Sequence, residues 1–190
     1  EIHIYNKTIP QNFLIANIGS GVSIVKVTHK KYERIGGTNI GGMTFFKLCQ
    51  SITKCESFEE ILKLSNSGNN NNVDMLVKDI YGTDYSNLNG DLIASSYGKF
   101  SLNQKISNAD TISSLLKMIS YNISQIVTLY SFQENINLVI FTGFFVNDNI
   151  EVIRNINFGI KFWSKEIITD LYLKNNGYIC SLGAMLKQII

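Results

Sequence analysis

Two glycine-rich turns near the start of the chain constrain its fold more than any other feature of the sequence. The first contains Gly19 and Gly21, and the second extends from Gly36 to Gly42. Because glycine has no Cβ, such turns suit a tight backbone conformation or the close approach of a ligand. A pair of them within one short span predicts that the chain is organised around a binding site.

Strands are expected on both sides of the first turn. Apolar residues 13–16 lead into it, and residues 24–28 leave it in a β-branched, partly alternating order. The pattern predicts a hairpin connection at Lys30-Lys31, after which residues 32–35 return as a strand. The second turn then opens a helical run over residues 44–52.

The position of the second turn suits it to bind phosphate. A glycine-rich turn at a helix N-terminus presents N–H donors and the positive end of the helix dipole. In and after the first turn, Ser20 and Ser23 add hydroxyls that can bind an alcohol or a phosphate. The pattern indicates a nucleotide site, although it matches neither a Walker loop nor the Rossmann fingerprint.

The rest of the chain predicts an α/β fold. Ser57 and Glu60 form a capping pattern for a helix over 58–65, and Asp110 is expected to cap the longest helix, over 111–132. The other expected elements are helices over 42–53, 73–81, 150–162 and 179–189, strands over 138–141 and 167–173, a strand or extended loop over 93–97, and a polar loop over 69–72. This order predicts a mixed sheet packed with helices.

Composition argues against several classes of protein. The 190 residues fit one domain or one lobe of a two-lobed enzyme, and a net charge of +2 with scattered lysines gives no case for a nucleic-acid surface. No apolar run suits a membrane span or a signal peptide. Cys49, Cys55 and Cys180 lack metal-ligand spacing, so they predict reduced, buried thiols in a cytoplasmic protein.

The two turns, taken with later segments, resemble the eukaryotic-type pantothenate kinases. The segments that carry the resemblance read NIGSGVSI at 17–24, GTNIGGMTF at 37–45, CESFEE at 55–60, DIYGTDY at 79–85, ASSYG at 94–98 and FWSK at 162–165. The resemblance implies the ribonuclease H-like, actin-like ATPase fold of the sugar-kinase superfamily, in which two related lobes close around ATP. Residues 1–190 would be the C-terminal lobe, and the N-terminal lobe would be absent from this chain.

The activity that the resemblance implies is ATP-dependent phosphorylation of pantothenate to 4′-phosphopantothenate, the first step of coenzyme A biosynthesis. A carboxylate deprotonates or orients the hydroxyl, which attacks the γ-phosphoryl group in line, with Mg²⁺ stabilising the charge. The carboxylate and the first phosphate loop would lie in the absent lobe. No catalytic residue or metal ligand is therefore expected in this chain, and the isolated piece is expected to be inactive. The family also implies a homodimer and acyl-CoA as a feedback ligand.

The resemblance assigns three groups of residues. The residues expected to bind the acceptor substrate are Ser20, Ser23 and Arg34. Those expected at the nucleotide are Gly19, Gly21, Thr38, Gly41, Gly42 and Gly143. Those expected in the pantetheine and acyl-CoA pocket are Tyr81, Tyr85, Ile93, Ala94 and Trp163.

The sequence departs from the family pattern at three places. Met43 stands where the family carries a third glycine, which implies a stiffer backbone in the second turn. Phe144 replaces an asparagine beside Gly143, so a polar side-chain contact with the adenosine is in doubt there. The family's Pro-Gly-Trp is replaced over residues 89–92, which puts ligand contacts around Ile93 in doubt.

Structural explanations compete with each assignment. The two serines could satisfy only their own turn, Arg34 could be a solvated charge, and the glycines could serve only to turn the chain into a packed helix. The aromatic residues could belong to the core. Two other functions also remain open, a non-catalytic acyl-CoA-binding relative and an actin-like scaffold switched by nucleotide.

Overall fold

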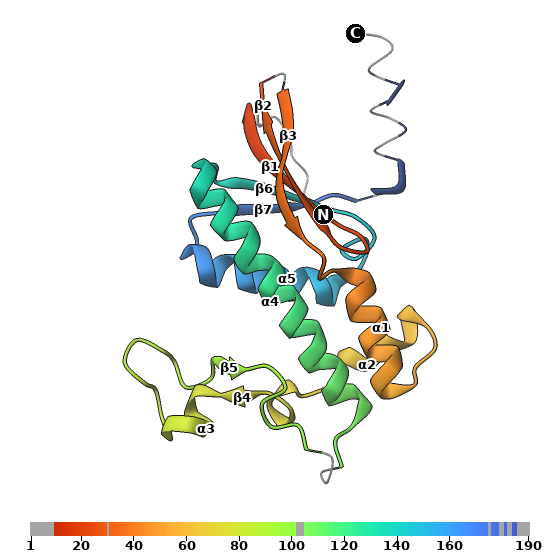
Figure 1. Ribbon diagram of the computed structural model, residues 1–190, viewed down its shortest axis with the longest axis vertical. Coiled ribbons are helices and arrows are strands. Elements are labelled where there is room, and N and C mark those ends of the chain that lie inside the picture. Colours follow the sequence, from red (N-terminus) through yellow and green to blue (C-terminus); the bar gives the residue numbers. More distant parts are fainter. Residues whose placement is uncertain are drawn as a thin grey trace.

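The structure, a computed structural model, describes residues 10–29, 31–101, 105–174, 176–178, 181 and 184–185. A five-stranded mixed sheet in the order β3-β2-β1-β6-β7 is its central element (Figure 1). The strands are β1 (Asn12–Ile18), β2 (Val22–Thr28), β3 (Lys31–Thr38), β6 (Leu138–Thr142) and β7 (Thr169–Tyr172). The first three are antiparallel, whereas β6 runs parallel to both β1 and β7. The expected mixed sheet is therefore confirmed.

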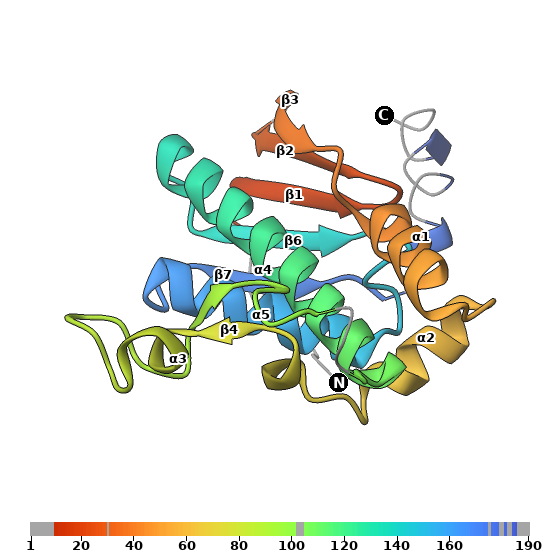
Figure 2. The same cartoon turned by 60° about the horizontal axis from the view of Figure 1, so that its bottom comes forward.

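Four helices pack against one another, and two of them also contact the sheet. They are α1 (Gly42–Thr53), α2 (Phe58–Ser65), α4 (Asn108–Glu134) and α5 (Ile150–Ser164). Figures 1 and 2 show α4 crossing the sheet, with α1 and α2 gathered at the end of α4 where that helix begins. Helix α5 packs along α4, so closely that a Cβ added at Gly159 would lie 2.7 Å from the Cβ of Ser124.

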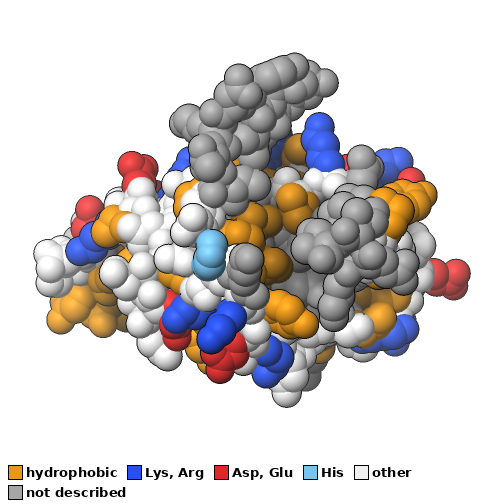
Figure 3. Space-filling model, turned by 90° about the horizontal axis from the view of Figure 1, so that it is seen from above, with side chains coloured by type: hydrophobic (Ala, Val, Ile, Leu, Met, Phe, Trp, Pro, Cys, Tyr) orange, Lys and Arg blue, Asp and Glu red, His pale blue; other side chains and the backbone are white. Residues whose placement is uncertain are grey.

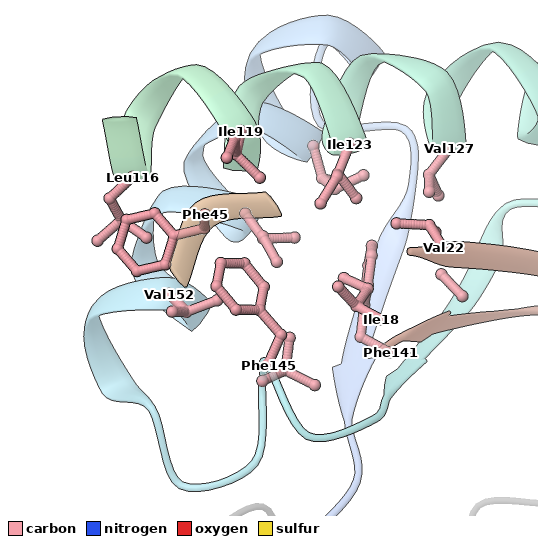
Figure 4. Packing of buried hydrophobic residues seen from close by; sticks show 14 of the residues in the cluster. Ile18, Val22, Phe45, Leu116, Ile119, Ile123, Val127, Phe141, Phe145 and Val152 are labelled. Carbon is pink, nitrogen blue, oxygen red and sulfur yellow. The ribbon is translucent and has the colours of Figure 1, made fainter. Parts of the chain in front are cut away.

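The core lies between the sheet and these helices. Figure 4 shows Ile119 and Ile123 of α4 on the side of the helix that faces Ile18 of β1 and Phe141 of β6. None of these four side chains is more than 1% exposed. Burial alternates along β1 with the two-residue period of a strand and recurs along α4 with helical spacing. The apolar faces that these two periodicities create, on the strand and on the helix, therefore pack together in one core.

The longest helix begins earlier than predicted, and Asp110 does not cap it. Ser107 is the N-cap, and its Oγ accepts a hydrogen bond of 3.0 Å from the backbone N–H of Asp110. The carboxylate of Asp110 instead accepts from the backbone N–H of Asn69, at 2.7 Å, and from the Nδ2 of Asn72, at 3.0 Å. The prediction for Asp110 is wrong because a tertiary contact uses its carboxylate.

The cap predicted for α2 forms on one side only. Ser57 Oγ accepts from the backbone N–H of Glu60 at 3.1 Å, and the helix has the predicted bounds. In a full capping box the Glu60 carboxylate would accept from the backbone N–H of Ser57. It accepts instead from the backbone N–H of Glu56, at 3.1 Å.

The polar run 69–72 is not the open loop that its composition predicts. Residues Asn70–Asn72 form a short 3-10 turn, η1, and Asn70 is only 4% exposed. Its side-chain amide donates to the fully buried carboxylate of Asp74, at 2.8 Å. A buried hydrogen-bonding partner therefore draws this asparagine into the protein.

The helix expected over residues 73–81 is divided into two elements. Residues Met75–Leu76 form strand β4, and only Val77–Tyr81 form a helix, α3. Strand β4 pairs with β5 (Ile93–Ser95) in a separate two-stranded sheet. The alternative of a strand at the start of 93–97 is thus the correct one.

Several other expectations can be compared with the described part of the chain. None of its helices is long and apolar enough to cross a bilayer. On the face seen in Figure 3, basic and acidic side chains are intermixed rather than separated by sign. Cys49 and Cys55 are buried free thiols, and burial raises the pKa of Cys49 to about 12. Lys30, Cys180 and most of the helix expected over 179–189 lie outside the described residues.

The core contact of α4 leads to a stability prediction. Ile119→Ala should lower the free energy of unfolding by about 2–5 kcal/mol, because it leaves a cavity between helix and sheet. Leu129→Ala, on the same helix but at a side chain that is 61% exposed, should change it by no more than about 0.5 kcal/mol. Urea denaturation of both variants checks this, and equal losses would contradict the packing described.

Candidate functional site

The second glycine turn is seated directly on the first. The backbone N–H of Gly42 donates to the carbonyl of Gly19 at 2.9 Å, and that of Met43 donates to the carbonyl of Ser20 at 3.3 Å. A Cβ added at Gly41 would lie 2.6 Å from the Cα of Gly21. The two motifs, separate in the sequence, therefore form one site at the N-terminus of α1.

The second turn is shorter than predicted. Strand β3 continues through Gly36 and Gly37 to Thr38, so the turn itself is limited to residues 39–41. Gly36 is needed for packing, because an added Cβ would lie 2.1 Å from the ring of Tyr130 on α4. The prediction that Gly36 begins the turn is wrong, since this glycine allows the strand to approach a helix.

Two of the three residues expected to bind the acceptor meet across neighbouring strands. A register shift between Ile24 and Val25 of β2 interrupts the pairing with β3. Ser23 lies on one side of this irregularity, and Arg34 pairs with Val25 on the other. The Nε of Arg34 donates to the Oγ of Ser23 at 3.1 Å, and Arg34 is exposed. The remaining guanidinium donors are thus held beside the serine at the surface.

Ser20, the third of these residues, lines an open hollow beside the contact of the two turns. The hollow has a volume of about 530 Å³, and its other lining residues are Gly21, Asn39, Met43, Thr44 and Lys47. Ser23 and Arg34 are not part of this lining. The structure therefore brings Ser23 and Arg34 together and places Ser20 in the adjoining hollow.

The backbone donors expected for phosphate are engaged within the protein. Besides the bonds of Gly42 and Met43, the N–H of Gly41 donates to Thr44 Oγ1 at 3.2 Å. Thr38 Oγ1 accepts from the N–H of Ile40 at 3.1 Å. In this conformation the N–H groups of the second turn thus have a structural role, because they bind within the turn and to the first turn.

Gly19 differs from the glycines that are held by close contacts. A Cβ added at Gly19 would meet no atom within 4 Å, whereas one at Gly21 would lie 2.9 Å from the carbonyl oxygen of Thr38. The packing of the protein therefore does not itself require glycine at position 19. Open space above a backbone without a side chain is the geometry that a closely approaching ligand needs.

Lys47 is the charged residue among those lining the hollow, and the sequence analysis did not identify it. Its ammonium donates to Gln50 Oε1 at 2.8 Å and lies 5.0 Å from the centre of the Phe46 ring. Residues three and four apart share one face of a helix, so Thr44 and Met43 of the hollow predict that Lys47 lies beside them. That spacing was the signal in the sequence that could have identified it.

Gly143 directly follows β6 and lies next to the first turn. Its φ is +104°, and an added Cβ would lie 2.4 Å from the carbonyl of Ile18, at the end of β1. Because β1 and β6 are parallel, their carboxyl ends meet at this edge of the sheet, where α/β folds commonly bind ligands. Phe144, which follows, is 73% exposed, and Phe145 packs into the core against Phe45.

The residues expected around pantetheine and acyl-CoA are spread over three parts of the fold. Tyr81 and Tyr85 stack with ring centres 3.9 Å apart, and both are about half exposed. Ile93 and Ala94 lie on β5, and Ile93 lines a second cavity. Trp163, near the end of α5, contacts Phe162 edge to face. None of the other four residues lines the cavity that Ile93 lines.

A family model and several curated relatives match most of the chain. The Fumble family model matches residues 3–187. Pantothenate kinase 2 of Oryza sativa subsp. japonica is 44% identical over 183 residues, which are 92% of this chain and 20% of that protein. Pantothenate kinase 1 of Arabidopsis thaliana is 44% identical over 180 residues, which are 90% of this chain and 47% of that protein.

A relative with a different name is equally similar. The 4′-phosphopantetheine phosphatase of Mus musculus is 45% identical over 179 residues, which are 92% of this chain and 22% of that protein. The chain thus spans between about a fifth and about half of the length of these curated relatives.

A solved structure confirms the class of fold. The Bacillus thuringiensis ParM hybrid protein with ADP, containing two ParM mutants, aligns with a TM-score of 0.54 at 11% identity. The alignment covers 98% of this chain and 26% of that chain. The expected actin-like α/β fold is therefore confirmed.

The contact between the two turns predicts opposite outcomes for two glycines. Gly41→Ala should lower the free energy of unfolding by about 1–3 kcal/mol, because its Cβ meets the backbone of the first turn. Gly19→Ala should stay within about 0.5 kcal/mol of the wild type, because its Cβ meets open space. Thermal and urea melts of both variants provide the measurement. A more destabilising change at Gly19 than at Gly41 would contradict the description of the site.

Proposed function

Because the chain belongs to the Fumble family, we propose that it is the C-terminal lobe of an ATP-dependent pantothenate kinase. The whole protein would phosphorylate the primary hydroxyl of pantothenate, the first step of coenzyme A biosynthesis, in the cytoplasm. The curated pantothenate kinases at 44% identity support this reaction, although the chain covers only part of each.

The contact between Arg34 and Ser23 is the observation that carries the proposal. An exposed arginine whose Nε is fixed by a serine keeps its other N–H donors in a defined direction. Those donors suit the carboxylate and amide oxygens of pantothenate, and the hydroxyls of Ser23 and Ser20 can pair with its polar groups. The hollow beside Ser20 then leaves room for the phosphate that is to be transferred.

The nucleotide would lie over the first turn, against the open side of Gly19. Gly21, Thr38, Gly41 and Gly42 would then shape the floor of the phosphate site rather than donate to it, since their contacts join the two turns. Gly143, at the end of β6, would lie on the adenosine side. Positive charge for the phosphates would come from the ammonium of Lys47.

Mg²⁺ would reach this lobe bound to the phosphates of ATP rather than to a cluster of protein ligands. Among the described residues, no group of three or more His, Cys, Asp or Glu side chains could hold a metal. Mg²⁺ is commonly bound by one or two carboxylates, water and the substrate's phosphates. When bound to ATP it would neutralise charge that develops on the transferred phosphoryl group.

The other lobe would supply the first phosphate loop and the carboxylate that orients the attacking hydroxyl. Residues 1–190 alone would therefore bind ligands weakly and show no turnover. In the whole protein, Tyr81, Tyr85, Ile93, Ala94 and Trp163 would surround acyl-CoA as a feedback ligand. Their separation within one lobe is consistent with a homodimer in which a second copy completes the pocket.

The mouse relative named as a phosphatase shows why a direct assay is needed. It is 45% identical to this chain over a region that makes up only 22% of its own length. A region similar to this chain therefore occurs in a protein that is named as a phosphatase and not as a kinase. ATP-dependent formation of phosphopantothenate by the whole protein would support the proposal. Binding of acyl-CoA without turnover would favour the non-catalytic relative, and nucleotide-driven polymerisation would favour the scaffold.

Arg34 provides the sharpest mutational test of acceptor binding. Arg34→Ala should lower kcat/KM for pantothenate by about tenfold to a hundredfold, because a charged hydrogen-bond donor is lost from the acceptor site. The melting temperature should hardly change, since the side chain is exposed. Steady-state kinetics with pantothenate varied provide the measurement.

The matched control is Lys31→Ala, which removes an exposed cation from the same strand. It should leave kcat/KM unchanged. If both variants lose activity equally, Arg34 acts through general electrostatics, and the assigned contact with the acceptor is refuted.

Lys47 is expected to act on the nucleotide rather than on the acceptor. Lys47→Gln should raise KM for ATP by about threefold to thirtyfold while KM for pantothenate stays nearly constant, since only a phosphate contact is lost. Lys47→Arg, which keeps the charge, should recover part of the loss. An unchanged KM for ATP in Lys47→Gln would exclude this role.

A further inference from the structure

A second cavity lies away from the two glycine turns. It has a volume of about 320 Å³ and is formed by α4, α5 and the segments around η1 and β5. Among its lining residues are Lys117, Tyr121, Arg154 and Phe158. A volume of this size is at the lower end of the range that holds small organic ligands.

A chain of buried hydrogen bonds fixes Lys117 at this cavity. The carboxylate of Asp74, which is 0% exposed, accepts from Ser114 Oγ, from the backbone N–H of Tyr97 and from Asn70 Nδ2. The Oδ1 of Asn70 accepts in turn from Lys117 Nζ at 2.6 Å. The amide of Asn70 thus lies between a buried carboxylate and the ammonium, and it holds both in place.

The ammonium of Lys117 has donors left for a ligand. An ammonium carries three N–H donors, and the hydrogen bond to Asn70 occupies one of them. Burial lowers the pKa of Lys117, which means that the site withholds water from the charged form. A bound anion would restore the stabilisation that the charge loses with its water.

The other charges that line the cavity are already paired. Glu151 binds Arg154 at 3.0 Å, and Asp91 binds Lys78 at 2.6 Å. Lys117 has no carboxylate within 4.0 Å among the residues that the structure describes. Among the described lining residues, Lys117 is therefore the cation without an ion pair, although the carboxylates of Asp74 and Glu151 also act on its charge through space.

Two aromatic rings form an apolar wall of the same cavity. Tyr121 of α4 and Phe158 of α5 stack with ring centres 5.5 Å apart and planes inclined by 27°. Burial raises the pKa of Tyr121 to about 12, so its hydroxyl stays protonated at neutral pH and can donate to an anion. A charged donor beside an aromatic wall suits a ligand with one anionic end and one flat apolar end.

We propose that this cavity binds a small organic anion, with its carboxylate or phosphate against Lys117 and its apolar part against Tyr121 and Phe158. The site shares only Ile93 with the residues expected around acyl-CoA. It contains no residue of the hollow at the glycine turns. The proposal therefore stands or falls independently of kinase activity.

Calorimetric titration of the whole protein with four probes tests the proposal. Acetate and inorganic phosphate examine the charged group alone, and benzoate and phenyl phosphate add a ring. The two aromatic probes should bind more tightly than the two without a ring, by about threefold or more. The stronger of the two aromatic probes identifies the anionic group that the cavity prefers.

Lys117→Met should weaken the better probe by about tenfold or more, since a charged hydrogen bond is lost. The control, Lys63→Met, removes an exposed lysine from α2 and should leave binding unchanged. Equal affinity of wild type and Lys117→Met would overturn the proposal. If none of the four probes binds, the proposal is also overturned. This includes the case in which a second copy of the chain covers the cavity.

A second variant keeps the test decisive if Lys117→Met fails to fold. Phe158 is 52% exposed, so Phe158→Ala should fold normally. It should remove the preference for benzoate over acetate while leaving acetate binding unchanged. A preference that survives in Phe158→Ala would contradict the assigned orientation of the ligand and overturn the proposal.

Discussion

The hydrogen bonds between the two glycine turns are the contact on which the site depends. The carbonyls of Gly19 and Ser20 accept the first N–H groups of α1, and Gly41 rests against Gly21 without room for a Cβ. This contact fixes the start of α1 against the β1–β2 connection. The start of α1 in turn sets the position of Lys47, one helical turn further on. The N–H groups at a helix N-terminus often bind a ligand, but here those of Gly42 and Met43 bind the first turn of the same protein.

A consequence is that side chains, rather than the N–H groups of the second turn, are the polar groups that this site can offer to a ligand. Arg34 and Ser23 are held across the irregular pairing of β2 and β3, and Ser20 and Lys47 lie in the neighbouring hollow. Of the two glycines of the first turn, Gly19 is the one with open space beside its Cα. In the proposed kinase, the joined glycine turns would form a rigid base, and the polar and charged side chains would project from it toward the acceptor. Such an arrangement suits an acceptor with several polar groups.

Much of this arrangement could be predicted from the sequence, and the exceptions have physical causes. Local patterns predicted the bounds of α2 and the presence, but not the full length, of the strands around the first turn, since these follow from capping and periodicity. They failed for Asp110, whose carboxylate binds residues far away in the sequence, and for Asn70, which is buried by Asp74. Lys47 could have been placed by helical spacing, whereas the loss of free donors at Gly42 depends on a tertiary contact.

The most direct measurement of the central claim is a calorimetric titration of pantothenate into the whole protein, with a non-hydrolysable ATP analogue present. The account predicts one pantothenate bound per chain, with an affinity that falls by about tenfold in Ser23→Ala while the affinity for the analogue is retained. Binding of pantothenate with the same affinity in wild type and Ser23→Ala would contradict it, because the acceptor would then lie away from the β2–β3 contact.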